Sequence, residues 1–179
     1  MGHGEDHADA GGRTKRFADV EGLREWLTEN GMDDAAVADV ADVRALRDAL
    51  VTVLLGHSGG PGTDDAALAA AEEHLSRAAV RHPLLATVDR RGAHLSPAQG
   101  GLPGAVGRVL AAMAELALTD TWVRLKACRN QHCHLAFHDR SRNTSGAYCS
   151  PRCSTQVAMR AHRRRRAASS GRPTPDAGA

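Results

Sequence analysis

The sequence predicts a mainly α-helical protein, and its composition gives the first reason. Hydrophobic residues make up 42% of the 179 residues, enough for a core, but aromatic residues make up only 3%. A core built mostly from Leu, Val and Ala favours helices, because β-rich folds use more aromatic and β-branched residues. We expect a helical N-terminal domain over residues 17–126, with one small β-hairpin. Residues 1–16 are rich in Gly, His and Asp and are predicted to form a disordered tail.

Apolar residues that recur at helical spacing predict the helices of this domain. Asp19 is a suitable cap for the first helix, and Asp33 or Asp34 starts the second. Pro83 ends the third helix, and Pro103 begins the fourth. The four predicted helices cover residues 19–30, 33–55, 63–82 and 103–117.

A hairpin is expected between the third and fourth helices. Its strands are Leu84–Asp89 and Ala93–Leu95, joined through residues 90–92. After the fourth helix, a further helical turn through Trp122 and Leu125 leads towards the first cysteine. No run of residues is long and apolar enough for a membrane span, so we expect a cytoplasmic protein without membrane contact.

The four cysteines of the chain all lie in one stretch near the C-terminus. Cys128 and Cys133 form one close pair, and Cys149 and Cys153 form a second. The fifteen residues between the pairs can form a hairpin or knuckle that brings them together. Four thiolates satisfy one structural Zn²⁺, which takes tetrahedral sulfur ligands at about 2.3 Å. We therefore expect a four-cysteine zinc-ribbon or treble-clef-like finger over residues 127–166.

Other interpretations of the cysteines remain open. Two disulfides would need an oxidising compartment, whereas residues 1–16 are polar and charged and do not read as a signal peptide. A redox-switched site that releases zinc on oxidation would use the same ligands as a static one. His132 and His134 flank Cys133 and are further candidate ligands, although four cysteines already fill the coordination shell.

The second cysteine pair coincides with a predicted helix start. Ser150 is a good N-cap and Pro151 suits the first helical position. Cys153 then falls in the first turn, where the helix dipole favours thiolate over thiol. The helix ends in four successive arginines, Arg163–Arg166, and a second disordered tail is predicted over residues 167–179.

Charge is distributed unevenly along the chain. Residues 1–120 hold 11 Lys and Arg against 19 Asp and Glu, a balance of −8, whereas residues 121–179 hold 12 against 2, a balance of +10. An acidic body with a basic, zinc-bearing end is typical of nucleic-acid-binding proteins, although solvated basic tails share the pattern. Four successive arginines spread over about 300° of a helix, so they cannot all pack against a core.

The candidate nucleic-acid contacts are polar and cationic residues of the finger. Phosphate contacts give affinity without specificity, so sequence reading should come from the basic helix or from the loop between the cysteine pairs. Phe137 and Tyr148 are the finger's only aromatic residues for stacking single strands, which favours duplex DNA over RNA. The predicted contact residues are Arg140, Arg142, Asn143, Arg152, Gln156, Arg160, Arg163, Arg164, Arg165 and Arg166.

The sequence contains no recognisable catalytic motif. There is no His-Glu-x-x-His and no Gly-x-Ser-x-Gly, and the glycines of residues 57–62 do not follow a phosphate-loop pattern. Glu72, Glu73 and His74 could bind a metal, but an exposed helix face explains them more simply. We therefore expect no enzymatic activity.

The finger's signature residues also support a family resemblance. They are Cys128, Cys133, Phe137, Asp139, Ser141-Arg142-Asn143, Cys149-Ser150 and Cys153, followed by the basic helix. With these residues, the stretch 124–166 resembles the CGNR-type zinc finger at the C-terminus of bacterial stress-induced transcription regulators. Residues 17–126 resemble, more loosely, the helical N-terminal (ABATE-like) domain of the same proteins, through residues 23–27 and 45–50.

The chain departs from the family pattern in three places. The tetrad Cys-Gly-Asn-Arg reads Cys153-Ser154-Thr155-Gln156 here, and the usual Arg-Arg-Trp reads Gly146-Ala147-Tyr148. These changes keep the metal ligands but remove polar and cationic groups near them. The apolar strand that opens the family's N-terminal domain is also missing, so we expect either a shortened version or a true start upstream of Met1.

The resemblance implies a transcription regulator of the stress response that binds DNA through its zinc finger. The helical domain is then a candidate for homodimerisation and for sensing a small-molecule effector. Two alternatives stay open at this point. The same electrostatics suit an RNA-binding protein, and the altered tetrad suits a protein–protein adaptor whose finger no longer binds nucleic acid.

Overall fold

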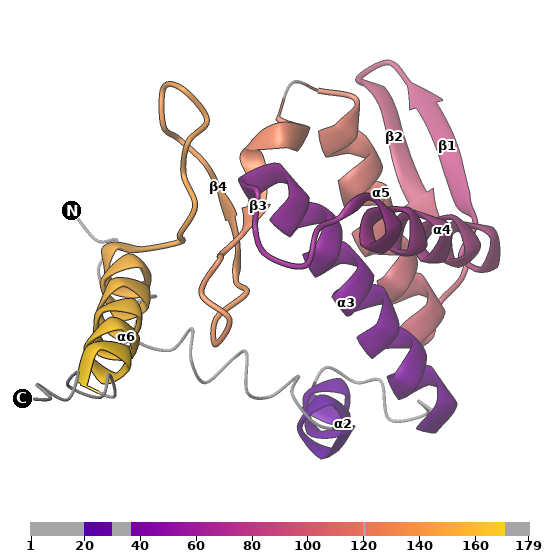
Figure 1. The fold of residues 1–179 in the computed structure, drawn as a ribbon. Coiled ribbons are helices and arrows are strands. Elements are labelled where there is room, and N and C mark those ends of the chain that lie inside the picture. Colours follow the sequence, from indigo (N-terminus) through magenta and orange to yellow (C-terminus); the bar gives the residue numbers. More distant parts are fainter. Residues whose placement is uncertain (1–19, 30–36, 120, 171–179) are drawn as a thin grey trace, which may run out of the picture.

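The computed structural model describes residues 20–29, 37–119 and 121–170, and these residues form a mainly helical protein (Figure 1). The mainly α fold class predicted from the sequence is confirmed, as is the small hairpin inserted among the helices. The N-terminal part contains the helices α2 (Val20–Glu29), α3 (Val37–Ser58), α4 (Asp65–Arg81) and α5 (Gly101–Ala117).

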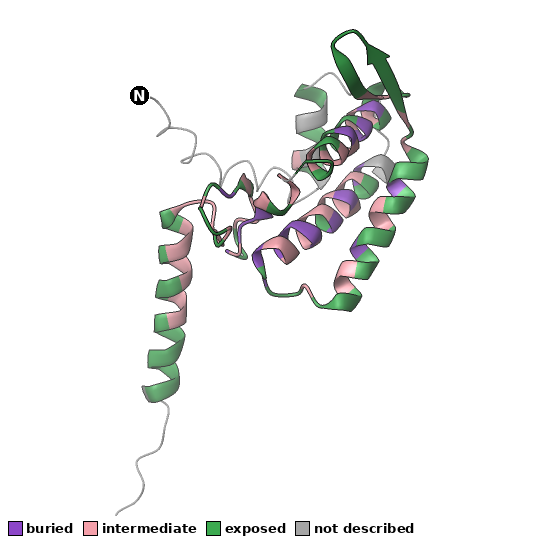
Figure 2. Ribbon diagram, turned by 90° about the horizontal axis from the view of Figure 1, so that it is seen from above, coloured by how far each residue is buried: buried purple, intermediate pink, exposed green. Residues whose placement is uncertain are grey.

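α3 is the central helix of the N-terminal part. It packs along α4, contacts α2, and touches a strand of the C-terminal part. Leu46 of α3 packs with Ala78 of α4 and Val106 of α5, and this cluster is the middle of the core. Figure 2 shows the buried residues concentrated along α3 and the facing sides of α4 and α5. The buried hydrophobic residues of α3 are Val40, Leu46, Ala49, Val53, Leu54 and Leu55.

The boundaries of α4 follow the predicted signals. Asp64 precedes the helix and its carboxylate accepts a hydrogen bond from the backbone N–H of Ala67 at 2.8 Å, which satisfies one of the free donors of the first turn. The helix ends at Arg81, two residues before Pro83, as expected from the restriction that proline places on its predecessor.

α3 continues to Ser58, three residues past the predicted end near Leu55. Tertiary contacts outweigh the weak helix propensity of Gly56 here. The hydroxyl of Ser58 donates to the carbonyl oxygens of Leu55 and Ala127, at 3.0 and 3.3 Å. Nδ1 of His57 lies 2.8 Å from the carbonyl oxygen of Leu125, so this nitrogen carries the donated proton.

The hairpin consists of β1 (Leu84–Asp89) and β2 (Gly92–Pro97), which pair antiparallel. Most of its side chains are exposed. β2 lies against α5, where a Cβ atom added to Gly107 would come within 2.9 Å of the Cβ of Pro97. The absence of a side chain at Gly107 therefore allows this close approach.

The C-terminal part begins with the 3₁₀ turn η1 (Trp122–Arg124), which matches the predicted helical turn. β3 (Leu125–Ala127) and β4 (Ala136–His138) then form a short antiparallel hairpin. β3 packs on α3, and Ala127 shares a buried cluster with Leu54 and Leu55. The first strand of the finger is thus fixed to the helical part.

α6 (Pro151–Ser170) projects away from the rest of the molecule (Figures 1 and 2). The sequence placed its end at Arg166, with a disordered tail from residue 167. The helix in fact continues for four more residues, because alanines favour helix and the hydroxyl of Ser169 donates to the carbonyl oxygen of Arg166 at 2.9 Å.

Several predictions lie outside the described residues. They are the disordered tail over residues 1–16, the cap at Asp19, the end of the first helix at residue 30, the helix start at Asp33 or Asp34, and the tail beyond Ser170. None of the described helices is long and apolar enough to cross a membrane.

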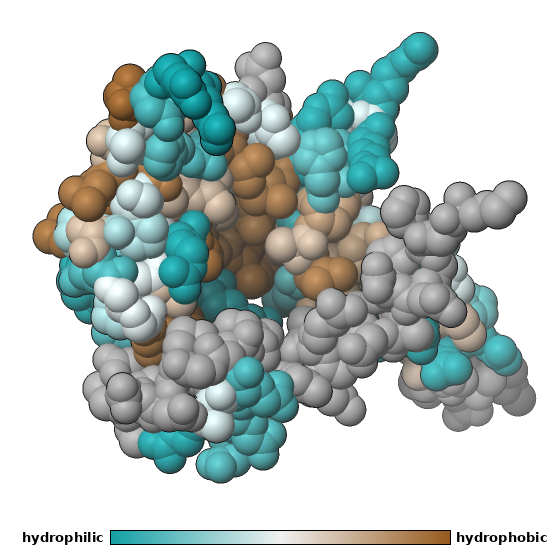
Figure 3. All heavy atoms as spheres, turned by 180° about the vertical axis from the view of Figure 1, so that it is seen from behind, coloured by the Kyte–Doolittle hydropathy of each residue, from teal (hydrophilic) through white to brown (hydrophobic). Residues whose placement is uncertain are grey.

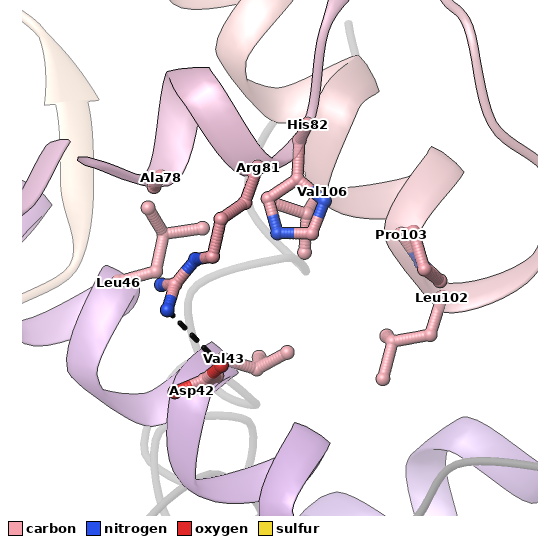
Figure 4. A pocket seen from close by; sticks show the side chains of 9 residues that line it. All are labelled: Asp42, Val43, Leu46, Ala78, Arg81, His82, Leu102, Pro103 and Val106. Atoms are coloured by element: carbon pink, nitrogen blue, oxygen red, sulfur yellow. Dashed lines mark ion pairs between the residues drawn. The ribbon is translucent and has the colours of Figure 1, made fainter. Parts of the chain in front are cut away.

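A small cavity lies where α3, α4 and α5 meet (Figure 4). Its volume is about 40 Å³, and Arg81 and Asp42 form an ion pair of 3.5 Å at its edge. The lining includes Leu46, Ala78 and Val106 of the core cluster. A space of this size holds at most a water or two, so we interpret it as a packing gap.

A larger apolar groove separates the helical part from the finger. It has a volume of about 510 Å³, and its walls come from α3, α5 and the β3–β4 hairpin. In the space-filling view from behind, hydrophobic side chains gather in the hollow between these two parts (Figure 3). Arg47 and His134 are the charged or titratable residues among those that line it.

Candidate metal centre

The first cysteine pair lies on a tight knuckle at the end of the β3–β4 hairpin. The backbone N–H of Cys128 donates to the carbonyl oxygen of Leu135 at 3.0 Å. The N–H groups of Cys133 and His134 both donate to the carbonyl oxygen of Asn130, at 2.7 and 3.3 Å. His134 adopts a left-handed conformation, φ 48°, which closes the turn. The knuckle thereby brings Cys128 and Cys133 to the same side.

The second pair lies at the start of α6, as predicted. Pro151 is the first helical residue, and Ser150 caps the helix by accepting a hydrogen bond from the N–H of Cys153 at 3.4 Å. Cys149 precedes the cap and Cys153 lies in the first turn. Their sulfur atoms are therefore held near the positive end of the helix dipole.

The four sulfur atoms converge on one point. All four lie within 4.8 Å of one another, and Cys149 Sγ is 3.7 Å from both Cys133 Sγ and Cys153 Sγ. A tetrahedron of sulfur ligands about 2.3 Å from zinc has edges of about 3.8 Å. The arrangement therefore fits one structural zinc ion with four thiolate ligands and no open position.

His132 and His134 do not belong to this cluster. Among the residues that the structure describes, the four cysteines form the only group of metal-ligand side chains close enough to hold an ion. His132 is exposed beside the knuckle, and His134 lines the apolar groove, where burial and the charge of Arg47 lower its pKa. The interpretation of these histidines as competing ligands is not supported.

The environments of Cys133 and Cys149 favour the protonated thiol when zinc is absent. Burial raises the pKa of Cys133 to about 11, and burial together with the neighbouring thiols raises the pKa of Cys149 further. Burial also acts on Cys153, but hydrogen bonds from Asn130 and Ser150 outweigh it and lower that pKa. Cys153 is therefore more ready to bind a metal than Cys133 and Cys149, from which zinc must displace protons.

We expect zinc affinity to rise steeply with pH. Because the raised pKa values of Cys133 and Cys149 keep these thiols protonated at neutral pH, each must lose a proton as zinc binds. The apparent affinity should then increase about tenfold per pH unit for each proton released. Competition with a chromophoric chelator between pH 6 and 8 measures this slope. An affinity independent of pH would show that the metal-free thiols are already ionised.

A buried ion pair holds the loop between the two cysteine pairs. Nζ of Lys126 lies 2.8 Å from a carboxylate oxygen of Asp139, and the two side chains are only 2% and 3% exposed. Lys126 also donates to the carbonyl oxygens of Thr144 and Gly146. The hydrogen bond from Lys126 holds the pKa of Asp139 far below its usual range, with N–H donors from Ser141 and Gly146 adding to the effect.

Arg124 and Gly146 complete this support. One guanidinium nitrogen of Arg124 donates to the carbonyl oxygens of Asp139 and Ser141, at 3.1 and 2.9 Å. A Cβ atom at Gly146 would lie 2.7 Å from a carboxylate oxygen of Asp139, so only glycine fits there. The sequence analysis named Asp139 but missed Lys126 and Arg124. The available signal was a lysine placed directly between two apolar residues, Leu125 and Ala127.

The predicted nucleic-acid contacts fall into two groups. Gln156 and Arg160 are half-buried and bound to the knuckle: Asn130 donates to Gln156 at 3.1 Å, and Arg160 donates to Asn130 at 3.0 Å. The others are exposed on the loop or on α6, and their role stays a prediction. These exposed residues are Arg140, Arg142, Asn143, Arg152, Arg163, Arg164, Arg165 and Arg166.

Comparison with known protein families agrees with this architecture. A family model described as "Putative stress-induced transcription regulator" (ABATE) matches residues 5–120, well over half of the chain. The chain belongs to this stress-induced transcription regulator family. A second model, the CGNR zinc finger, matches residues 124–166 and thus contains all four cysteines. The resemblance noted from the sequence is therefore confirmed for both the N-terminal domain and the zinc finger.

In this member of the family, the CGNR model and the sulfur geometry together identify the cofactor as one structural zinc. The fourth residue of the altered tetrad is Gln156, and its side-chain oxygen accepts a hydrogen bond from Asn130 of the knuckle. The match of the first model begins at residue 5, in a segment outside the described residues. Among curated protein sequences, no individual relative matches the chain.

Proposed function

We propose that this family member is a transcription regulator that binds duplex DNA through α6 and the loop between the cysteine pairs. One observation carries the proposal. Residues 140–170 contain eight arginines and no Asp or Glu. Arg140, Arg142, Arg152 and Arg163–Arg165 form no ion pair with any described residue. So many uncompensated guanidinium groups on a projecting helix suit a polyanion.

The shape of α6 favours duplex DNA. The helix has 20 residues and therefore extends about 30 Å, and the major groove of B-DNA, about 12 Å wide, admits an α-helix. Stacking of single-stranded bases needs exposed aromatic rings. Phe137 and Tyr148, the finger's aromatic residues, are both half-buried. Arg152 and Arg142 are exposed and are the proposed base-reading residues, since guanidinium forks match the edge of guanine.

The proposal assigns no chemical reaction to the chain. The four thiols are ligands of zinc, and a zinc-held thiolate in a closed site is a poor nucleophile. A regulator that binds the chromosome acts in the bacterial cytoplasm, and this location is part of the proposal. Dimerisation of the helical part and an effector also stay proposals.

Removing two arginines from α6 should weaken binding to any duplex. We expect Arg163→Ala with Arg165→Ala to reduce the slope of log K against log salt by up to about 1.8, because each lost phosphate contact removes about 0.9. The matched control is Arg90→Ala with Arg91→Ala, which removes the same charge from the exposed hairpin turn. Fluorescence anisotropy with a random 20-base-pair duplex across a salt series measures both.

The same experiment separates the alternatives. Equal slopes for the two double variants would show that α6 does not contact phosphates and would contradict the proposal. Tighter binding of structured RNA than of duplex DNA, with the same loss in the α6 variant, would make the chain an RNA-binding protein. Absence of any nucleic-acid binding at low salt would favour the adaptor alternative.

A further inference from the structure

A second basic feature, a pocket, lies beside the zinc site. A pocket of about 220 Å³ opens between the zinc knuckle, α6 and the loop that follows α3. Three arginines and a histidine contribute to its walls, and none of its lining residues is Asp or Glu. The lining residues are Pro61, Arg129, Gln131, His132, Tyr148, Val157, Arg160 and Arg164.

Arg129 is the cation deepest in this arrangement. It follows the zinc ligand Cys128, and its backbone N–H is bonded to the carbonyl oxygen of Ala147 at 3.0 Å. Its guanidinium reaches the loop after α3, where a Cβ atom at Gly59 would lie 2.7 Å from one of its terminal nitrogens. The Nε atom is fully buried and has no hydrogen-bond partner. Because the protein encloses Nε, the terminal nitrogens of this guanidinium are the candidates to bind a ligand in the pocket.

Arg160 is held at the pocket by the knuckle itself. It donates to the side-chain oxygen of Asn130 at 3.0 Å, and Asn130 is only 2% exposed. The same asparagine donates to Gln156 at 3.1 Å and accepts from the N–H of His132 at 3.3 Å. Arg160 therefore has a fixed orientation. The hydrogen-bond network that fixes it includes residues next to the metal ligands.

Arg164 follows Arg160 by one helical turn, so the two side chains lie on the same face of α6. Together with Arg129 they bring three guanidinium groups from two elements to one concave site. Like charges brought together in this way repel one another, and no carboxylate lines the pocket to offset the repulsion. An anion with several oxygen acceptors would relieve this repulsion and accept hydrogen bonds from the guanidinium groups.

We propose that this pocket is a phosphate-binding site formed by Arg129, Arg160 and Arg164. Guanidinium forks match phosphate oxygens, and the pocket has room for a phosphate with part of its sugar. The inference extends the proposed function, because a backbone phosphate of the bound DNA is the expected occupant. It would fix the position of the finger on the duplex, and the exposed arginines of α6 would then contact neighbouring phosphates. Arg129 is thus a further binding residue that the sequence analysis did not name.

The test uses the zinc-loaded full chain and inorganic pyrophosphate as the probe. Isothermal titration should show that the unaltered protein binds pyrophosphate and that the Arg129→Met variant binds it at least about tenfold more weakly. This substitution removes the charged guanidinium group but keeps an apolar side chain of similar length. Arg91→Met on the hairpin turn removes the same charge elsewhere and should bind as the unaltered protein does. Equal affinity for pyrophosphate in both variants would overturn the proposal.

Arg164→Met provides a second variant that does not depend on a buried side chain. Arg164 is exposed, so its replacement should leave zinc content and melting temperature unchanged while weakening pyrophosphate binding. Unaltered binding in a fully zinc-loaded Arg164→Met protein would count against a site that includes α6. Loss of zinc from the Arg129→Met variant would make Arg164→Met the deciding measurement.

Competition with DNA identifies the source of the phosphate. If a saturating duplex abolishes pyrophosphate binding, the pocket receives a backbone phosphate. If both bind together, the pocket takes a free phosphorylated ligand, and the site stands with a different occupant. Failure of the proposed function would give another result: the protein would not bind duplex DNA, but it would still bind pyrophosphate, and that binding would still depend on Arg129. Conversely, consider the result that both pocket variants bind DNA with the affinity and salt dependence of the unaltered protein. That result would leave the proposed function intact and refute the pocket as a DNA contact.

Discussion

Replacing Cys149 with serine should remove zinc from the protein and unfold the segment between residues 128 and 153. Cys149 Sγ lies 3.7 Å from two of the other sulfurs, close to the edge length of the ligand tetrahedron. Zinc contributes about 10–16 kcal/mol to the folding of small zinc fingers. The β3–β4 hairpin has only three residues per strand and cannot supply a comparable free energy. We expect less than one equivalent of bound zinc and a lower melting temperature.

The matched control is His132→Ala, which changes a potential ligand directly beside Cys133. Because His132 lies outside the sulfur cluster, this variant should keep one zinc per chain and the melting temperature of the unaltered protein. For both variants, mass spectrometry under native conditions measures the zinc content, and circular dichroism measures the melting temperature. A Cys149→Ser protein that retains stoichiometric zinc with undiminished stability would show that zinc does not need this sulfur, and the four-thiolate site would be wrong.

Replacing Lys126 with methionine should have the largest effect of any substitution outside the metal ligands. The variant leaves the carboxylate of Asp139, which is 3% exposed, without its cation. Breaking a buried ion pair in this way costs about 3–5 kcal/mol, which is a large part of the free energy of unfolding of a typical domain. Urea denaturation measures the loss. Arg77→Met, which breaks the exposed pair with Glu73, is the control and should cost less than about 1 kcal/mol.

A second substitution distinguishes loss of the ion pair from loss of packing. Asp139→Asn in the Lys126→Met background removes the unpaired charge and keeps an acceptor oxygen for one of the two N–H groups, those of Ser141 and Gly146, that bind the carboxylate. We expect it to recover much of the stability. In the unaltered protein the depressed pKa of Asp139 means that its contribution is complete above about pH 4 and is lost as the pH falls further. A double variant no more stable than Lys126→Met would show that the ammonium matters only through packing.

The metal site could be predicted from the sequence because each of its parts is local. Two close cysteine pairs, a serine cap and a proline at the first helical position are all short-range signals, and each does what it predicts. The hairpin at residues 84–97 is similar, since Gly92 and the two residues before it mark the turn. These elements depend little on the rest of the fold.

The remaining features depend on contacts between distant segments. Lys126 is buried because Asp139 and two carbonyl oxygens of the following loop surround it, and no local pattern reports that. α3 extends beyond Leu55 because Ser58 bonds to a strand 69 residues later. The role of Arg129 could not be predicted from the sequence for the same reason, because its guanidinium lies against a glycine of the loop after α3. In each of these cases, contacts with distant segments outweigh the local propensity of the sequence.

The hydrogen bonds between α3 and β3 also link the metal to the helical part. His57 and Ser58 bind the carbonyl oxygens of Leu125 and Ala127, and Cys128, a zinc ligand, is the next residue. Linkage between two sites is reciprocal, so any free energy by which bound zinc orders β3 also stabilises the last turn of α3. A change that rotates or frays α3 must weaken zinc binding by the same factor. Zinc therefore contributes to the stability of a helix that it does not touch.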